Sequence, residues 1–141
     1  MNKGYADPES KKSSISVLPG SKYTTYKKGS FLVIDLWFTS KLNHKSFGIT
    51  IIWYKQSPVW FMVYAGEYEK DDIPFLKQVL ALTYKNKSFH GGRGVPSYHA
   101  DGMHYSNNQT KSGFEDFGGK ETIYKNQKVR GWHKYWGMSL I

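Results

Sequence analysis

The sequence has no cysteine, only two arginines and no long hydrophobic run. Without cysteine the chain can form neither a disulfide framework nor a thiolate metal site, which is compatible with the cytoplasm. The longest apolar stretch, residues 31–38, is interrupted by Asp35 and is far shorter than the roughly 20 residues of a membrane-spanning helix. The N-terminal residues lack the apolar run of a secretory signal. We therefore expect a cytoplasmic protein that does not bind a membrane.

Aromatic residues are abundant and predict a folded chain. The 11 Tyr, 8 Phe and 5 Trp make up 17% of the 141 residues, which is far more than a disordered chain carries. This length gives room for one hydrophobic core. We expect a polar N-terminal arm or edge strand over residues 1–17, followed by a single domain over residues 18–141.

The net charge of +9 comes mainly from lysines near both ends of the sequence. Such basicity can attract the phosphates of a nucleic acid, or it can keep an aromatic-rich domain in solution. Dedicated nucleic-acid binders usually cluster arginine as well as lysine, and this sequence has little arginine. If the protein does bind nucleic acid, the candidate residues are Lys27, Lys28, Lys128, Arg130 and Lys134.

Two hairpins are predicted in the first half of the sequence. The segments 23–26 and 31–38 flank a short turn that contains Gly29, and the segments 49–54 and 59–64 flank another. Their aromatic and β-branched residues favour strands, and glycine tolerates the positive φ of a tight turn. Because both alternating faces of 31–38 are apolar, we expect this strand to be covered on both sides, or to lie centrally under a helix and long loops.

One substantial helix is predicted over residues 73–84. Asp71 and Asp72 are N-cap candidates, Pro74 suits a first helical turn, and the apolar residues that follow recur at helical spacing. The predicted fold class is α+β, with a curved, mostly antiparallel sheet of about six to eight strands packed on this one main helix.

The C-terminal region repeats a pattern of the central hairpin. The run 54–59 and the later Tyr64 are echoed by the run 124–129 and the later Tyr135. The second copy has one extra residue before its tyrosine, which predicts a β-bulge in the second of two related hairpins. Two ordinary hairpins rich in aromatic residues would produce the same pattern.

Several motifs resemble a known family. The most specific is PVWFMVYAG at residues 58–66, and the weaker ones are KGYA at 3–6, LPGS at 18–21 with Tyr26 and Gly29, Ile34 with Asp35, Trp53 with Tyr54, and FGGKETI at 117–123. They resemble the domain of unknown function 5680 of bacteria, which occurs alone or C-terminal to helix-turn-helix regulators. The resemblance runs almost end to end. It implies a compact α+β fold and a regulatory setting, here in the free-standing form, and it names no reaction.

The sequence departs from that family at two places. Where the family typically has a Gly-Glu-Glu run, this chain has Gly48, Ile49 and Thr50. Where the family has an asparagine, this chain has Val63. If the missing carboxylates serve chemistry or ligand binding in relatives, this member has lost that part.

Histidines suggest two weaker hypotheses. His90, His99 and His104 with Asp101 form the one cluster that could hold a metal, but in an extended chain His99 and His104 point in opposite directions. We therefore expect no metal and no cofactor. The same histidines with Arg93 could serve a metal-independent ribonuclease, in which one histidine takes the 2′-hydroxyl proton, another protonates the leaving group and the arginine holds the phosphate.

A glycine-rich segment and one carboxylate are the remaining candidates. Residues 91–94 could bring backbone amides to an anion, with Arg93 as a clamp, or could simply be a flexible connector.

Asp35 lies alone in an apolar run, where an unpaired carboxylate is costly. Its partner could be Arg93, a lysine, a tryptophan N–H or backbone donors. It is then either a structural residue or a ligand-binding one.

Together these observations favour a non-enzymatic binding or regulatory module, although they name no catalytic residue and leave an enzyme open. We expect the concave face of the sheet to hold a small anionic ligand or a partner protein. The candidate pocket residues are Asp35, Trp60, Tyr64, Arg93 and Glu121. The alternative is a nucleic-acid-directed protein, either a binder or a histidine-based ribonuclease.

Overall fold

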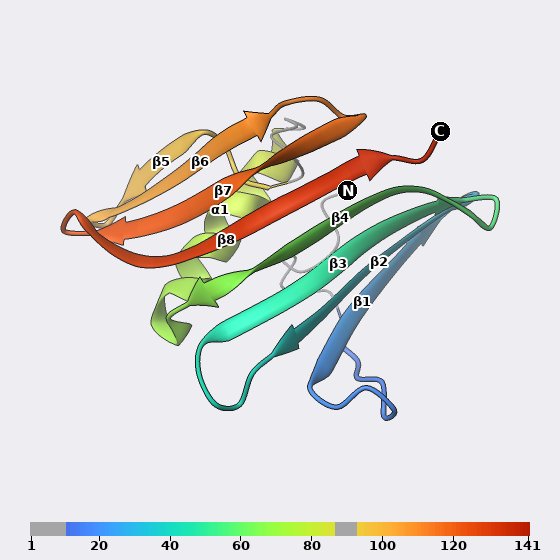
Figure 1. Cartoon of the computed structure of the whole chain (residues 1–141), viewed down its shortest axis with the longest axis horizontal. Coiled ribbons are helices and arrows are strands. Elements are labelled where there is room, and N and C mark those ends of the chain that lie inside the picture. The colour runs from blue at the N-terminus through green and yellow to red at the C-terminus, as the bar shows by residue number, and fades with distance from the viewer. Residues whose placement is uncertain (1–10, 87–92) are drawn as a thin grey trace.

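The computed structural model describes residues 11–86 and 93–141, most of which lie in strands (Figure 1). The strands are β1 Ser21–Lys28, β2 Phe31–Thr39, β3 Lys45–Tyr54, β4 Ser57–Tyr68, β5 Ser97–Ala100, β6 Met103–Lys111, β7 Asp116–Lys125 and β8 Lys128–Ser139. Between β4 and β5 lie a 3-10 turn, η1 Lys70–Asp72, and the helix α1 Ile73–Lys85. All eight strands form one antiparallel sheet in the order β1-β2-β3-β4-β8-β7-β6-β5.

The predicted class, α+β, is wrong because the fold is β-rich. One helix of 13 residues accompanies a sheet of eight strands. The antiparallel pairing, both predicted hairpins and the helix beginning at residue 73 are confirmed. The predicted number of strands, six to eight, agrees with the eight observed, and the error lies in the weight given to the helix, which packs in only one of the two buried clusters on the sheet. Four of the strands follow the helix, where polar residues alternate with buried ones such as Tyr105, Phe117 and Ile123. Such strands have few apolar residues, since every second side chain faces solvent.

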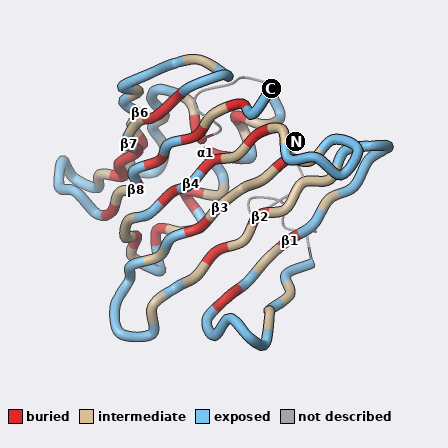
Figure 2. The backbone as a smooth tube through the Cα atoms, turned by 45° about the vertical axis from the view of Figure 1, so that its right-hand side comes forward, coloured by how far each residue is buried: buried red, intermediate tan, exposed pale blue. Residues whose placement is uncertain are grey.

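The helix α1 lies on one face of the sheet, which we call the helix face (Figure 1). Its buried residues Phe75, Leu76, Val79 and Leu80 pack in one cluster with Tyr68, Tyr105 and Ile123 of the sheet. Buried stretches run along the central strands, while the turns at the sheet ends are exposed (Figure 2). None of the described helical residues forms a segment long and apolar enough to cross a membrane.

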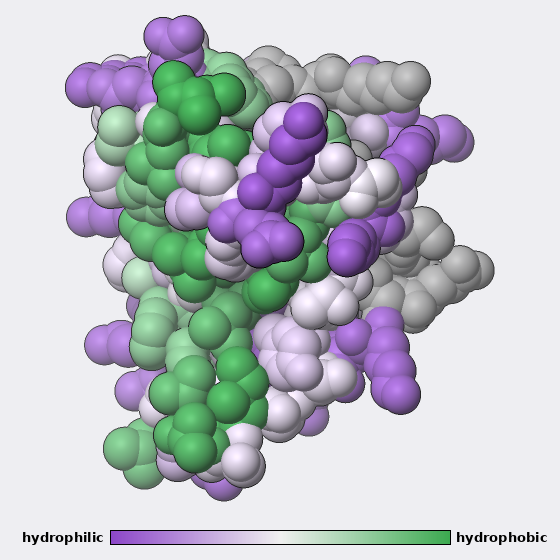
Figure 3. Space-filling view, turned by 90° about the vertical axis from the view of Figure 1, so that its right-hand side faces the viewer, coloured by the Kyte–Doolittle hydropathy of each residue, from purple (hydrophilic) through white to green (hydrophobic). Residues whose placement is uncertain are grey.

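The opposite face of the sheet is partly exposed, contrary to the expectation for residues 31–38. On β2, Asp35 and Trp37 are buried on the helix face, whereas Leu36 and Phe38 point to the other face and are half-buried. No described element covers that face. Nearby Phe47 is 55% exposed. Figure 3 views the molecule from the right-hand side of Figure 1. It shows hydrophobic residues gathered in one area of the surface, with charged residues around that area.

The start of α1 is fixed differently from the prediction. Pro74 lies in the first turn as expected, and Asp72 occupies the N-cap position. The Asp72 side chain makes no capping hydrogen bond, because its carboxylate accepts a hydrogen bond from Arg130 Nε of β8 at 2.9 Å. This ion pair links the start of α1 to β8, a central strand of the sheet.

The sequence repeat corresponds to two similar half-sheets. Strands β1–β4 and β5–β8 are two meanders that meet where β4 pairs with β8. The turns of the β3–β4 and β7–β8 hairpins both use two residues of positive φ, Lys55 and Gln56 in the first and Asn126 and Gln127 in the second. Both hairpins also contain a register shift of one residue. The bulge predicted for the second hairpin alone occurs in both. The turns equate Lys55 with Asn126, one position later than the repeat of 54–59 in 124–129 implies, so the second hairpin has no extra residue.

Each half carries the same tyrosine arrangement on the helix face. A tyrosine ring lies against a glycine of the neighbouring strand, and its hydroxyl donates a hydrogen bond to an Asp or Asn: Tyr64, Gly48 and Asp35 (2.8 Å) in one half, and Tyr135, Gly119 and Asn107 (2.5 Å) in the other. A Cβ on either glycine would lie 2.5 Å or 2.6 Å from the tyrosine hydroxyl. Since Tyr64 and Tyr135 are register partners, the pseudo-twofold axis lies between them.

The repeat predicts the effect of replacing Asp35 by Asn. Burial raises the pKa of Asp35, although hydrogen bonds from Tyr64 and Thr50 and the charge of Arg93 oppose the shift. With a raised folded-state pKa, the wild type loses stability as the pH rises through that value. Asparagine accepts the same hydrogen bond without a charge, as Asn107 does. We expect Asp35→Asn to keep or raise the unfolding free energy at pH 7 in urea titrations.

The matched control is Asp35→Ala, which leaves the buried Tyr64 hydroxyl without this acceptor. We expect it to lower the unfolding free energy by about 1–3 kcal/mol. If Asp35→Asn destabilises the fold as much as Asp35→Ala, the fold requires the negative charge of Asp35, and Asn107 is not its equivalent in the second half.

Candidate functional site

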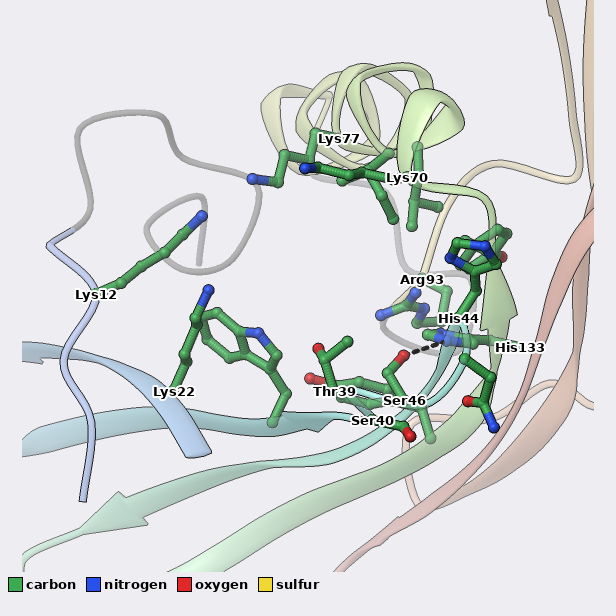
Figure 4. Close-up of a pocket in the computed structure, with 16 residues that line it drawn as sticks. Lys12, Lys22, Thr39, Ser40, His44, Ser46, Lys70, Lys77, Arg93 and His133 are labelled. Carbon is green, nitrogen blue, oxygen red and sulfur yellow. Dashed lines mark hydrogen bonds between the residues drawn. The ribbon is translucent and has the colours of Figure 1, made fainter. Parts of the chain in front are cut away.

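A cavity of about 410 Å³ lies between the helix face of the sheet and the start of α1 (Figure 4). Its walls come from segments far apart in the sequence, including β1–β4, η1, α1 and β8. The sheet supplies Trp37 and Tyr64, and the helix supplies Ile73 and Leu76. The apolar part of the wall therefore comes from the same two layers that form the core.

The lining of this cavity is strongly cationic. Among the residues that the structure describes, it includes no Asp or Glu, and the cationic or titratable side chains are Lys12, Lys22, Lys70, Lys77, Arg93, His44 and His133. Figure 4 shows four lysines around one side of the cavity and Arg93 with both histidines on another. Partial burial, together with the nearby Lys12 and Lys22, lowers the pKa of Lys77 to about 8. These groups repel one another, so an anion between them would be stabilised.

The deepest cation, Arg93, is paired with a buried carboxylate. Its guanidinium forms a short ion pair with Glu121 Oε1, and Nε donates to the same oxygen at 3.1 Å. The other carboxylate oxygen accepts a hydrogen bond from the Tyr105 hydroxyl at 2.6 Å. Burial opposes ionisation of Glu121, but the adjacent Arg93 outweighs it and lowers the pKa of Glu121. Arg93 also lies over the Tyr64 ring, 5.0 Å from its centroid.

The buried His133 lies beside this ion pair. Its Nδ1 is 3.7 Å from Glu121 Oε1, and its Nε2 is 3.2 Å from Ser46 Oγ. Burial and the charge of Arg93 lower the pKa of His133 to about 4, although Glu121 opposes the shift. The imidazole is therefore neutral at pH 7, with one nitrogen available to accept a proton.

The structure brings together four of the five predicted pocket residues. Tyr64 and Arg93 line the cavity. Asp35 lies behind Tyr64, and its partners are hydroxyls, Tyr64 at 2.8 Å and Thr50 at 3.2 Å, rather than the cation, indole or backbone donors considered above. Glu121 lies behind Arg93.

The fifth predicted residue, Trp60, lies elsewhere. It is buried in a second cluster, where its ring stacks on Phe117 at 5.4 Å and on Phe114 at 6.0 Å. It is not among the described residues that line the cavity. The predicted role of its ring as a pocket wall is taken instead by Trp37.

The residues proposed for nucleic acid do not share one surface. Lys27 and Lys28 end β1, close to the β3–β4 turn, whereas Lys128 and Arg130 begin β8 at the other end of the sheet. Lys134 lies on the face opposite the helix, and Arg130 is paired with Asp72. The cationic residues that do converge are those of the cavity.

The predicted histidine cluster is likewise divided. His99 and His104 do not point in opposite directions as expected for an extended chain, because the chain turns at Asp101 and Gly102; they are cross-strand partners with stacked rings, 4.0 Å between centroids, in the β5–β6 hairpin. They line a separate hollow, while Arg93 lies in the cavity with His133. His90, Gly91 and Gly92 lie outside the described residues. Within residues 11–86 and 93–141 no group of three metal-ligating side chains converges.

Comparison with protein families identifies a match over most of the chain. The domain of unknown function (DUF5680) matches residues 40–139. This range includes the motifs at 58–66 and 117–123, and excludes those at 3–6 and 18–21. No curated protein and no solved structure matches the chain.

Proposed function

The chain belongs to the DUF5680 family of domains of unknown function, and from this premise we propose that its cavity binds a small anionic molecule. The observation that carries the proposal is the lining itself. Four lysines and one arginine converge, with no carboxylate among the described lining residues. Charge-assisted hydrogen bonds from lysine and arginine are the usual means of holding phosphate or carboxylate groups.

The size of the cavity favours a small molecule over a polymer. Small-molecule sites usually enclose about 300–1,000 Å³. The cavity here falls in that range, at about 410 Å³. Trp37, Ile73 and Leu76 supply the apolar part of the wall, among the cationic side chains. The ligand that fits best carries at least two negative charges on a compact, partly apolar body.

Removing one lysine from the rim tests the proposal. We expect pyrophosphate, used as the probe, to bind at pH 7 and low salt, and Lys77→Gln to weaken binding about tenfold because one charge-assisted hydrogen bond is lost. Because an anion favours the charged form of Lys77, whose pKa is about 8, affinity should also fall between pH 7 and pH 9. Isothermal titration calorimetry measures both effects.

The control lies on the same helix. Lys85 is exposed in the last turn of α1 and does not line the cavity. Lys85→Gln removes the same net charge and should leave the affinity unchanged. Equal weakening by both variants would show that pyrophosphate responds only to overall charge, which contradicts a built site.

A further inference from the structure

Four residues form a row across four adjacent strands. The register pairs are Ser46 with Gly66, Gly66 with His133, and His133 with Glu121, from β3, β4, β8 and β7 respectively. Register partners in neighbouring strands project their side chains to the same face of a sheet. The hydroxyl, the imidazole and the carboxylate therefore all lie on the helix face, and Ser46 and His133 both line the cavity.

The glycine in this row makes room for the imidazole. A Cβ on Gly66 would lie 2.0 Å from the Trp132 carbonyl oxygen and 2.6 Å from His133 Cδ2. With no side chain there, the His133 ring reaches across β4 and places Nε2 3.2 Å from Ser46 Oγ (Figure 4). The ring thus spans the whole distance between the serine and the carboxylate.

The surroundings of the ring determine its tautomer. Nδ1 is buried, has no hydrogen-bond partner among the described residues, and faces Glu121 Oε1 at 3.7 Å. A proton on Nδ1 is attracted by that carboxylate, so Nε2 keeps the lone pair that accepts the Ser46 hydroxyl proton. Catalytic hydrogen bonds are often long before substrate binds, and they shorten in the complex.

We propose that this row makes the cavity a hydrolytic site for anionic esters, with Ser46 as the nucleophile and His133 as the general base. The proposal rests on the proposed anion-binding function, because the surrounding cations select the substrate. A nucleophile, a neighbouring base and a carboxylate behind that base are the three parts that activate a serine hydroxyl in unrelated folds.

The reaction proceeds in two balanced steps. Ser46 Oγ attacks the ester carbonyl carbon while its proton moves to His133 Nε2; the ester C–O bond then breaks, and the departing alkoxide takes that proton. Water next attacks the acyl-serine and gives a proton to Nε2, and Ser46 Oγ leaves and regains it. One ester and one water molecule yield one carboxylic acid and one alcohol.

The neighbouring ion pair links this chemistry to an anionic substrate. Arg93 keeps Glu121 ionised and also disfavours a proton on His133. A substrate anion near Arg93 offsets its positive charge, so His133 becomes a stronger base when the cavity is filled. Glu121 acts as a positioning residue through the Nδ1 proton.

The test compares Ser46 with a serine outside the cavity. The substrates are p-nitrophenyl hemisuccinate, which is anionic, and p-nitrophenyl acetate, which is neutral. We expect kcat/KM to be at least about tenfold higher for the anionic ester, and Ser46→Ala to lower it at least about a hundredfold. Ser57 is exposed and does not line the cavity, so Ser57→Ala should leave kcat/KM unchanged.

Two further readouts support or overturn the assignment. Mass spectrometry of the wild type under turnover should find one succinyl group on Ser46, and the ¹⁵N shifts of His133 should show the proton on Nδ1. Hydrolysis that persists in Ser46→Ala, or a proton on Nε2, overturns the proposal. Pyrophosphate titration of the wild type separates anion binding from catalysis. If pyrophosphate binds but no ester is hydrolysed, only the proposed hydrolysis is contradicted. If pyrophosphate does not bind, the proposed anion site is contradicted.

Discussion

Replacing Glu121 by Gln is expected to lower the free energy of unfolding by about 3–5 kcal/mol, because the substitution leaves a buried guanidinium without its counter-ion. Glu121 is fully buried and Arg93 is 5% exposed, so water compensates little of the lost charge. Glutamine still accepts a hydrogen bond from Arg93, and the predicted loss therefore comes from the charge. For a domain of this size the midpoint of thermal unfolding should fall by about 10 °C or more.

Two controls show whether this loss belongs to the buried pair. Lys111 and Asp116 form an exposed ion pair, 2.7 Å between Nζ and Oδ2, and Asp116→Asn should leave the unfolding midpoint almost unchanged. The double variant Arg93→Met with Glu121→Leu removes both charges and should recover much of the lost stability. If Glu121→Gln unfolds at the same temperature as the wild type, the pair does not stabilise the fold.

Acidification from pH 6.5 to pH 4 is expected to lower the stability of the wild type by about 3 kcal/mol through His133 alone, because its pKa falls from 6.5 in the unfolded chain to about 4 in the fold. The folded-state pKa is depressed, so within this window the unfolded state binds the extra proton. This contribution is complete above pH 6.5 and is lost as the pH falls. Urea titrations at intervals of half a pH unit measure the slope.

His133→Gln should remove most of this slope. His104 is the control because its pKa is also lowered, by slight burial and by His99, but its ring stacks in the β5–β6 hairpin away from the buried ion pair. His104→Gln should therefore keep nearly the full pH dependence. An unchanged slope in His133→Gln would show that the imidazole is not held neutral in the cavity.

The difference between the two half-sheets explains where the cavity chemistry arises. In the second half, His133 pairs in register with Glu121, two residues before Tyr135 and two after Gly119. At the equivalent place in the first half, Met62 pairs with Thr50, two residues before Tyr64 and two after Gly48. The tyrosine and the glycine are the same in both halves. The neighbouring register pair is Met62 with Thr50 in the first half, neither of which ionises, and His133 with Glu121 in the second, both of which do. The chemistry therefore depends on an exception to the repeat.

Elements with strong local signals could be predicted from the sequence. The helix beginning at Ile73 has acidic residues before it, an early proline and apolar residues at helical spacing. The hairpin around Lys55 and Gln56 has aromatic and β-branched strands on both sides. The strands after Arg93 lack such runs, because their buried residues are separated by polar ones. The number of strands was nevertheless within the predicted range, and the predicted class was wrong because the single helix was treated as a structural layer of its own.

The candidate site depends on contacts that a single sequence does not show. Arg93 and Glu121 were both predicted, but no spacing rule pairs an arginine in a loop with a carboxylate of β7. His133, Ser46 and Lys77 were missed because each looks like an ordinary polar residue on its own strand or helix. Gly66 gave a usable signal, since a glycine inside a strand often marks a close approach of another group.

The most direct test of the account is a crystal structure of the protein grown with pyrophosphate. We expect density for the anion inside the cavity, within hydrogen-bond distance of Lys77 and Arg93, with the His133 ring still beside Ser46. The contradicting result is pyrophosphate bound only to surface lysines outside the cavity, under conditions in which calorimetry shows the protein to be saturated.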